Sequence, residues 1–165
     1  MVTIPHPARS ASEEIPRSPG PTDEQVVLSG IAKTVFRLNG QLLSIAEDLS
    51  GPAGLTAARW QILASVLQRP LSVAEISRQV GNTRQSVQRI ADLLVTERMA
   101  EYQPNPAHRR AKLLSPTAEG RSAVRRIAPA HSDLADRLST AYGRAELERL
   151  QQTLAQLSTV LEDIQ

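Results

Sequence analysis

A short segment of the chain gathers arginine and glutamine side chains at the spacing of one helical face. Arg84, Gln85, Gln88 and Arg89 are neighbours on an α-helix, and the apolar residues between them fall on the opposite face. An arginine can pair with O6 and N7 of guanine, and a glutamine with N6 and N7 of adenine. Exposed together on one helix, these side chains are suited to hydrogen bonding with base edges in the major groove of a DNA duplex.

The basic residues of the chain are concentrated around this segment. Between Arg78 and Arg126 there are ten Arg or Lys and four acidic residues, a net charge of +6, whereas the remainder of the chain has a net charge of −4. Nine of the ten are arginines, which bind phosphates and guanine edges through paired hydrogen bonds that lysine cannot make. Charge alone leaves open a solvated basic face with no partner.

Two predicted helices and a turn position the polar face. Residues 72–75, with the sequence Ser-Val-Ala-Glu, form a capping box that opens a short helix, and Gly81 with Asn82 forms a turn. Thr83 then caps the helix that contains the polar face. After Met99, residues 100–103 and 112–114 are predicted to pair as short strands. The sequence therefore predicts a helix-turn-helix followed by a basic hairpin.

Helices are also predicted on both sides of this unit. Residues 1–21 hold five of the eleven prolines and are predicted to be a disordered arm. A capping box at residues 22–25 opens a long helix to residue 50, and a second helix covers about 56–68. Ser115 and Pro116 are predicted to start a helix that Pro129 kinks or interrupts and that Gly143 ends, before a final helix. The predicted regions are 1–21 (arm), 22–50 (helix), 55–115 (winged helix-turn-helix) and 116–165 (C-terminal helices).

Three of the outer helices have narrow apolar seams with steps of three and four residues. The seams comprise Leu28, Ile31, Val35, Leu38, Leu42, Ile45 and Leu49; Val124, Ile127, His131, Leu134, Leu138 and Ala141; and Leu147, Leu150, Leu154, Leu157, Leu161 and Ile164. They either pack on one another within one chain or pair with a second copy. Because three such seams occur at the two termini, we favour a homodimeric helical bundle.

Two stretches resemble the multiple antibiotic resistance regulator (MarR) family of transcription regulators. Residues 81–87, Gly-Asn-Thr-Arg-Gln-Ser-Val, resemble that family's entry into its recognition helix. Residues 104–120, Pro-Asn-Pro-Ala-His-Arg-Arg-Ala-Lys-Leu-Leu-Ser-Pro-Thr-Ala-Glu-Gly, resemble its wing and the start of the next helix. The resemblance extends in helix order from about residue 23 to the C-terminus. It implies a mainly α fold, with a winged helix-turn-helix, a small β-hairpin wing, and terminal helices forming a dimerisation bundle.

Three positions depart from the family pattern. The family wing usually has an acidic residue two positions before its minor-groove arginine, but here His108 precedes Arg110 and has no permanent negative charge to orient it. Pro116 replaces a usual Leu and is acceptable at a first helical position. Arg98 stands where such regulators commonly have a Gly.

The resemblance implies a dimeric repressor that binds a near-palindromic operator in double-stranded DNA. Half-sites would be centred roughly 10 bp apart. The expected DNA-binding residues are Thr83, Arg84, Gln85, Ser86, Gln88, Arg89, Arg109 and Arg110. In this family a small aromatic or amphipathic effector binds between the dimer helices and the winged domain, where Trp60 and His131 are candidate contacts. The alternatives are a core tryptophan and a satisfied buried histidine.

Other functional classes receive less support. The chain has no cysteine, only three widely spaced histidines, and none of the common nucleotide-binding or hydrolase motifs, so we predict no enzyme, metal site or cofactor. No apolar run is long enough to span a membrane, and a cytoplasmic location is expected. The main alternative is a protein-interaction module whose winged helix no longer binds DNA.

Overall fold

The computed structural model describes residues 20–108 and 110–164, which form a mainly helical fold with one small sheet. The chain divides into two parts, one ending at Asn39 and one beginning at Gly40. The predicted arm falls almost entirely outside the described residues, as does Arg109.

The first part contains the beginning of helix α1 (Asp23–Ser50), which continues into the second part. The predicted capping box is present, since Thr22 Oγ1 accepts from the backbone N–H of Gln25 and the Gln25 side chain accepts from the N–H of Thr22. Apolar side chains along this part of α1 are exposed, among them Val26, Val27, Leu28, Ile31, Val35, Phe36 and Leu38.

The helix-turn-helix in the second part begins and ends at local capping signals. Helices α2 (Ala57–Ser65), α3 (Val73–Val80) and α4 (Arg84–Thr96) are each opened by the side chain of the preceding residue. Ser72 and Glu75 form the predicted capping box. Gly81 ends α3 with φ +68°, a left-handed conformation that favours glycine, so the chain turns directly toward Thr83.

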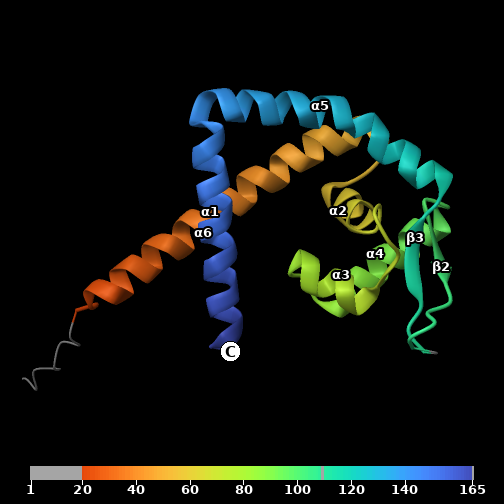
Figure 1. The fold of residues 1–165 in the computed structure, drawn as a ribbon, viewed down its shortest axis with the longest axis horizontal. Coiled ribbons are helices and arrows are strands. Elements are labelled where there is room, and N and C mark those ends of the chain that lie inside the picture. Colours follow the sequence, from red (N-terminus) through yellow and green to blue (C-terminus); the bar gives the residue numbers. More distant parts are fainter. Residues whose placement is uncertain (1–19, 109, 165) are drawn as a thin grey trace, which may run out of the picture. The chain divides into compact units, whose positions relative to one another are not determined.

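The hairpin strands belong to a three-stranded antiparallel sheet (Figure 1). Strands β2 (Ala100–Gln103) and β3 (Leu113–Pro116) form the predicted wing, with Tyr102 opposite Leu114. A third strand, β1 (Leu71–Ser72), pairs with the other edge of β3 and was not predicted. The sheet thereby joins the start of α3 to the base of the wing.

A single apolar core lies within the winged-helix region. Ile62, Leu63, Ile76, Val87, Leu94 and Leu114 are almost fully buried there. Gly120 lies so close to this region that a Cβ on it would be 2.0 Å from the carbonyl oxygen of Met99. The start of α5 therefore packs directly against the chain that enters β2.

Helix α5 (Ala118–Tyr142) starts later than predicted. Pro116 ends β3 opposite Ala100, and Thr117 is the N-cap, because its hydroxyl accepts from the N–H of Gly120. The proposed helical position of Pro116 was therefore wrong. The helix continues through Pro129 without interruption, and Gly143 separates it from α6 (Arg144–Asp163), as Figure 1 shows.

The apolar seam predicted over residues 124–141 of α5 does not form a single continuous surface. Ile127 is buried in the winged-helix core and Val124 packs against it, because the first turns of α5 lie on α2. On α6, by contrast, Leu150, Leu154 and Leu161 remain exposed.

Two arginines of α5 connect segments that are distant in the sequence. Arg121 donates to the carbonyl oxygen of Leu67 at 3.1 Å, and Arg126 donates to that of Ala53 at 3.2 Å. Both carbonyl groups lie near the ends of helical segments, where helices lack internal donors. No helix in the described ranges has the length and apolarity needed to cross a bilayer.

Candidate nucleic-acid interface

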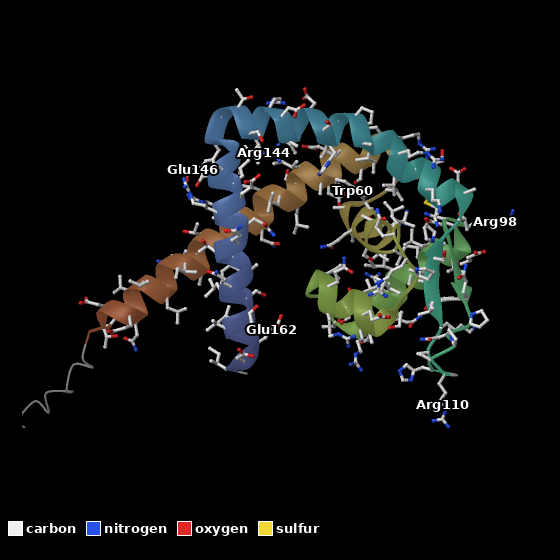
Figure 2. All side chains as sticks on the ribbon, viewed as in Figure 1. Trp60, Arg98, Arg110, Arg144, Glu146 and Glu162 are labelled. Atoms are coloured by element: carbon white, nitrogen blue, oxygen red, sulfur yellow. The ribbon has the colours of Figure 1, made fainter. Side chains whose placement is uncertain are left out.

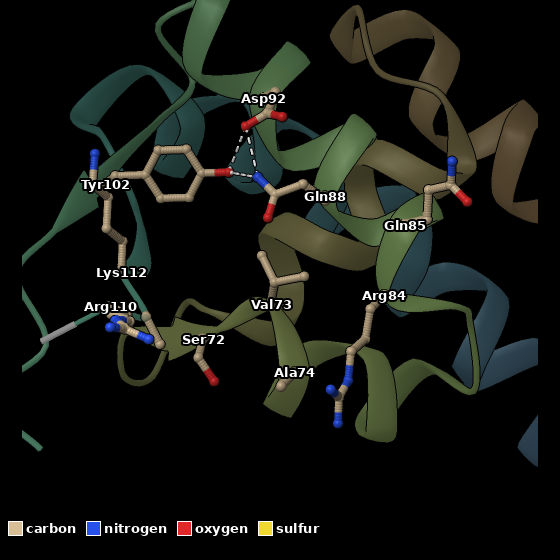
Figure 3. A pocket seen from close by; sticks show the side chains of 11 residues that line it. Ser72, Val73, Ala74, Arg84, Gln85, Gln88, Asp92, Tyr102, Arg110 and Lys112 are labelled. Carbon is tan, nitrogen blue, oxygen red and sulfur yellow. Dashed lines mark hydrogen bonds between the residues drawn. The ribbon is translucent and has the colours of Figure 1, made fainter. Parts of the chain in front are cut away.

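A hollow of about 670 Å³ separates helix α4 from the wing (Figure 3). We call it the α4–wing hollow. The residues that line it are Ser72, Val73, Ala74, Arg84, Gln85, Gln88, Asp92, Tyr102, Arg110, Ala111 and Lys112. Three of these side chains are cationic and one is a carboxylate, so the hollow favours a polyanionic ligand.

The predicted polar face of α4 is exposed. Arg84, Gln85, Gln88 and Arg89 all face solvent, while Val87 on the opposite face is fully buried. Within residues 20–108 and 110–164, no carboxylate forms an ion pair with Arg84 or Arg89. Both guanidinium groups are therefore available to an external acceptor.

The other two α4 candidates lie at the start of the helix. Thr83 is exposed, and its hydroxyl oxygen accepts from the N–H of Ser86 at 3.2 Å, which leaves its own hydrogen free to donate. Ser86 is half-buried, so it is less accessible than its neighbours. Both residues lie in the first turn of a helix, whose unpaired N–H groups favour an anion such as phosphate.

Gln88 forms hydrogen bonds with two neighbouring side chains. Its amide nitrogen donates to Asp92 Oδ1 at 2.8 Å and to the hydroxyl oxygen of Tyr102 at 2.7 Å. The Tyr102 hydroxyl in turn donates to Asp92 Oδ1 at 2.7 Å. These three residues, which we call the Gln88 cluster, join α4 to wing strand β2.

Tyr102 remains a neutral hydrogen-bond donor well above neutral pH. Burial raises the pKa of its hydroxyl to about 12, assisted by the hydrogen bond to Asp92 and the negative charge of that carboxylate. The ammonium group of Lys112 lies 5.8 Å from the centre of the Tyr102 ring, within cation–π range. The Tyr102 ring is thus approached by a side chain from the residue just before β3, while its hydroxyl reaches α4.

The wing tip presents Arg110 to solvent. Figure 2 shows this side chain projecting from the end of the hairpin, and it also borders the α4–wing hollow. A turn forms the tip, because the side chain of Asn105 accepts from the N–H of Ala107 and the carbonyl of His108 accepts from the N–H of Ala111. The tip geometry therefore comes from backbone and Asn105 contacts rather than from an acid at position 108.

The two candidate effector contacts lie together, away from the hollow. Trp60 of α2 is half-buried against the core, and His131 of α5 is exposed within the single chain. Their ring centroids are 5.5 Å apart with an interplanar angle of 83°, an edge-to-face arrangement. The structure thus brings together two side chains that are 71 positions apart in the sequence.

Sequence reasoning missed Tyr102 and Lys112 as parts of the site and Asp92 as the partner of Gln88. The signal for Asp92 was present, because residues four apart on a helix are neighbours. The placement of Tyr102 depends on how the wing packs on α4, which no local pattern encodes.

Comparison with known proteins identifies relatives for this arrangement. A family model described as MarR family matches residues 53–111. An uncharacterized protein of Mycobacterium tuberculosis is 35% identical over 135 residues, which cover 82% of this chain and 94% of that protein.

Two solved structures are similar over most of the chain. The M. tuberculosis transcriptional regulator MosR, in a complex with DNA, has a TM-score of 0.69 at 21% identity, covering 81% of this chain and 97% of that chain. A mutant of MarR from E. coli, complexed with operator DNA, has a TM-score of 0.70 at 20% identity, covering 82% and 99%.

These likenesses agree with the order of elements described above. The matched region 53–111 runs from the end of η1 (Gly51–Ala53) through the helix-turn-helix to the wing tip. The chain has the same fold as the two solved structures, and this fold includes the small sheet and the long helices outside the matched region. The chain therefore belongs to the MarR family and has its winged helix-turn-helix fold.

Proposed function

We propose that this chain is a cytoplasmic, homodimeric transcription repressor that binds a near-palindromic operator in double-stranded DNA and is released by a small aromatic or amphipathic ligand. The observation that supports DNA binding best is the α4–wing hollow, where the unpaired guanidinium group of Arg84 and the amides of Gln85 and Gln88 line the same space as Arg110 and Lys112. Two proteins with the same fold were crystallised with DNA, which agrees with this assignment.

Different residues take different parts in the proposed complex. The first turn of α4 enters the major groove, where Arg84, Gln85, Gln88 and Arg89 contact base edges, and Thr83 with Ser86 contacts the phosphates. Arg110, together with the adjacent Arg109, enters the minor groove and responds to its width and potential rather than to sequence.

The exposed apolar residues of the outer helices support the proposed homodimer. Leu150, Leu154 and Leu161 recur at steps of four and seven on α6, and a water-exposed stripe of this kind is the usual seam of a helical bundle. Two α4 helices related by twofold symmetry would then contact half-sites about one helical turn apart.

The Trp60–His131 pair is the proposed contact for the ligand. An aromatic acid can stack on the exposed face of the indole while the imidazole donates a hydrogen bond to its carboxylate. A ligand bound between α2 and α5 would change how α5 meets the winged-helix core, and thereby the distance between the two α4 helices.

Footprinting on the DNA upstream of the chain's own gene tests the proposal. We expect a protected site with twofold symmetry, and an affinity that falls steeply with salt as phosphate-bound counterions are released. Salicylate, as a simple aromatic acid, should change the fluorescence of Trp60, the only tryptophan, and weaken binding. Affinity that does not depend on salt, or equal binding to all sequences, would contradict a sequence-specific DNA-binding function.

A further inference from the structure

We propose that Tyr102, on the wing, is a positioning residue that sets the base preference of Gln88 by turning its carbonyl oxygen toward the DNA. This inference rests on the proposed function, since it concerns how the α4–wing hollow distinguishes one duplex from another. It assigns a role in sequence discrimination to a wing residue that does not itself contact a base.

The first step is the direction of the Gln88 amide. Its nitrogen lies within 2.8 Å of Asp92 Oδ1 and 2.7 Å of the Tyr102 hydroxyl oxygen, so the donor end of the amide is directed at the cluster. Figure 3 shows the carbonyl oxygen on the other side, directed into the hollow on the side of Val73. Gln88 therefore presents an acceptor to a ligand in the hollow.

The second step is the role of the two partners. Asp92 lies on the same helix as Gln88 and offers only acceptor oxygens at neutral pH. Tyr102 completes the Gln88 cluster, because its hydroxyl donates to Asp92 and accepts from Gln88. Its raised pKa keeps that donation intact over the whole physiological pH range.

The third step is the base chemistry. In the major groove adenine and cytosine present an amino group, whereas guanine and thymine present carbonyl oxygens at the corresponding place. A glutamine fixed with its oxygen outward accepts from an amino base and is repelled by a keto base. A glutamine whose side-chain amide can rotate forms a hydrogen bond with either kind of base, because it can present its oxygen or its nitrogen. The Gln88 cluster thus favours adenine or cytosine on the contacted strand and disfavours guanine and thymine.

The test begins by finding the position that Gln88 contacts. The wild-type chain selects duplexes from a randomised pool, and Gln88→Ala identifies the position whose preference depends on this side chain. Affinities are then measured for paired duplexes that differ only by an amino or a keto base there. Wild type should prefer the amino base by roughly fivefold, the value of one hydrogen bond.

Tyr102→Phe keeps the ring but removes the hydroxyl, so it should abolish this preference while leaving the preferences at other positions intact. Asp92→Ala, which removes the other anchor, should have the same effect. Tyr142→Phe is the matched control, because Tyr142 is exposed on α5, far along the chain from the hollow, and it should behave as wild type. Thermal unfolding of each variant verifies that it is folded.

Three outcomes would overturn the inference. The first is a keto base at the selected position in the wild-type site. The second is a Tyr102→Phe variant that keeps the amino preference, and the third is one that loses affinity equally on every duplex, as removal of a phosphate contact would. A wild-type chain that selects no sequence at all would contradict the proposed function itself, and is thereby distinguished from failure of this inference alone.

Discussion

The edge of one ring meets the face of the other where Trp60 and His131 approach, with their centroids 5.5 Å apart. This contact joins α2, inside the winged-helix core, to α5, which leads away from it. It is a direct side-chain link between the region that would bind DNA and the helices that would form the dimer.

Replacing His131 by alanine should lower the free energy of unfolding by about 0.5 kcal/mol, the lower end for an aromatic pair, because His131 is exposed. Urea unfolding followed by Trp60 fluorescence measures this change. His108→Ala, at an exposed position in the wing turn, is the control and should leave stability unchanged. Equal unfolding midpoints for wild type and His131→Ala would show that the contact contributes nothing.

Arg84→Ala should weaken binding to the selected operator by about 10- to 100-fold, as expected for loss of a paired contact to guanine. Binding to random duplex should fall much less. Fluorescence anisotropy at one fixed salt concentration compares the two. Arg137→Ala is the control, since Arg137 is exposed on α5 and lies near Asp133 rather than near the hollow. Equal losses on operator and random DNA would assign Arg84 to phosphate contact.

Leu154→Glu should convert the proposed dimer to a monomer, because it places a charge in the exposed apolar stripe of α6. Sedimentation velocity measures the change. Gln152→Glu adds a charge to the same helix outside the stripe and should remain dimeric. Deletion of residues 143–165 should likewise give a monomer with weak DNA affinity. A truncated chain that still sediments as a dimer would remove α6 from the interface.

Arg98→Gly should stabilise the protein by about 0.5–1 kcal/mol. Arg98 has φ +60°, and it is the only residue other than glycine with a positive φ in the described part of the chain. A Cβ in that conformation costs roughly 1–2 kcal/mol, which the greater freedom of glycine in the unfolded chain partly offsets. Arg98→Ala separates the effect of losing the charge from the effect of losing the Cβ, since it removes the charge but keeps the Cβ. A gain for Arg98→Ala equal to that for Arg98→Gly would contradict backbone strain.

Glu75 should make the stability of the protein depend on pH in the acid range. Its pKa is lowered from 4.5 to about 2 because the Ser72 N–H and hydroxyl donate to its carboxylate, with a smaller contribution from Arg69. A carboxyl group with a lowered pKa stabilises the folded state above its unfolded pKa, and this contribution is lost as the pH falls from 4.5 toward 2.

Urea unfolding of wild type and Glu75→Gln at successive pH values measures this effect. Glutamine can still accept from Ser72 but has no charge, so the advantage of wild type should shrink between pH 4.5 and about 2. The difference in the free energy of unfolding between wild type and Glu75→Gln should be constant above this pH range. A difference that does not change with pH would mean that the charge of Glu75 does not stabilise the cap.

The starts of α3 and α4 could be predicted because they depend on residues next to one another. Thr83 lies one residue before α4, and Ser72 lies one residue before α3, so each cap is visible in the sequence. Arg98, which stands where the resemblance implies a Gly, has a positive φ, and this conformation favours glycine.

Features that depend on distant segments could not be predicted in this way. Strand β1 has only two residues and exists because β3, more than 40 positions later, pairs with it. The hydrogen bond between Gln88 and Tyr102 spans 14 positions, and that from Arg126 to Ala53 spans 73. Each forms only once the core has brought the helices together, so amphipathic pattern and capping contain no information about it.

The missing side chain at Gly120 has a mechanical consequence. Because a Cβ on Gly120 would clash with the carbonyl oxygen of Met99, any larger residue there would push the first turn of α5 away from the root of the wing. From Gly120 the helix runs to Tyr142, which is 22 residues further on and roughly 33 Å away. A small change in the angle of α5 at Gly120 would therefore displace the end of the helix near Tyr142 by much more than its first turn.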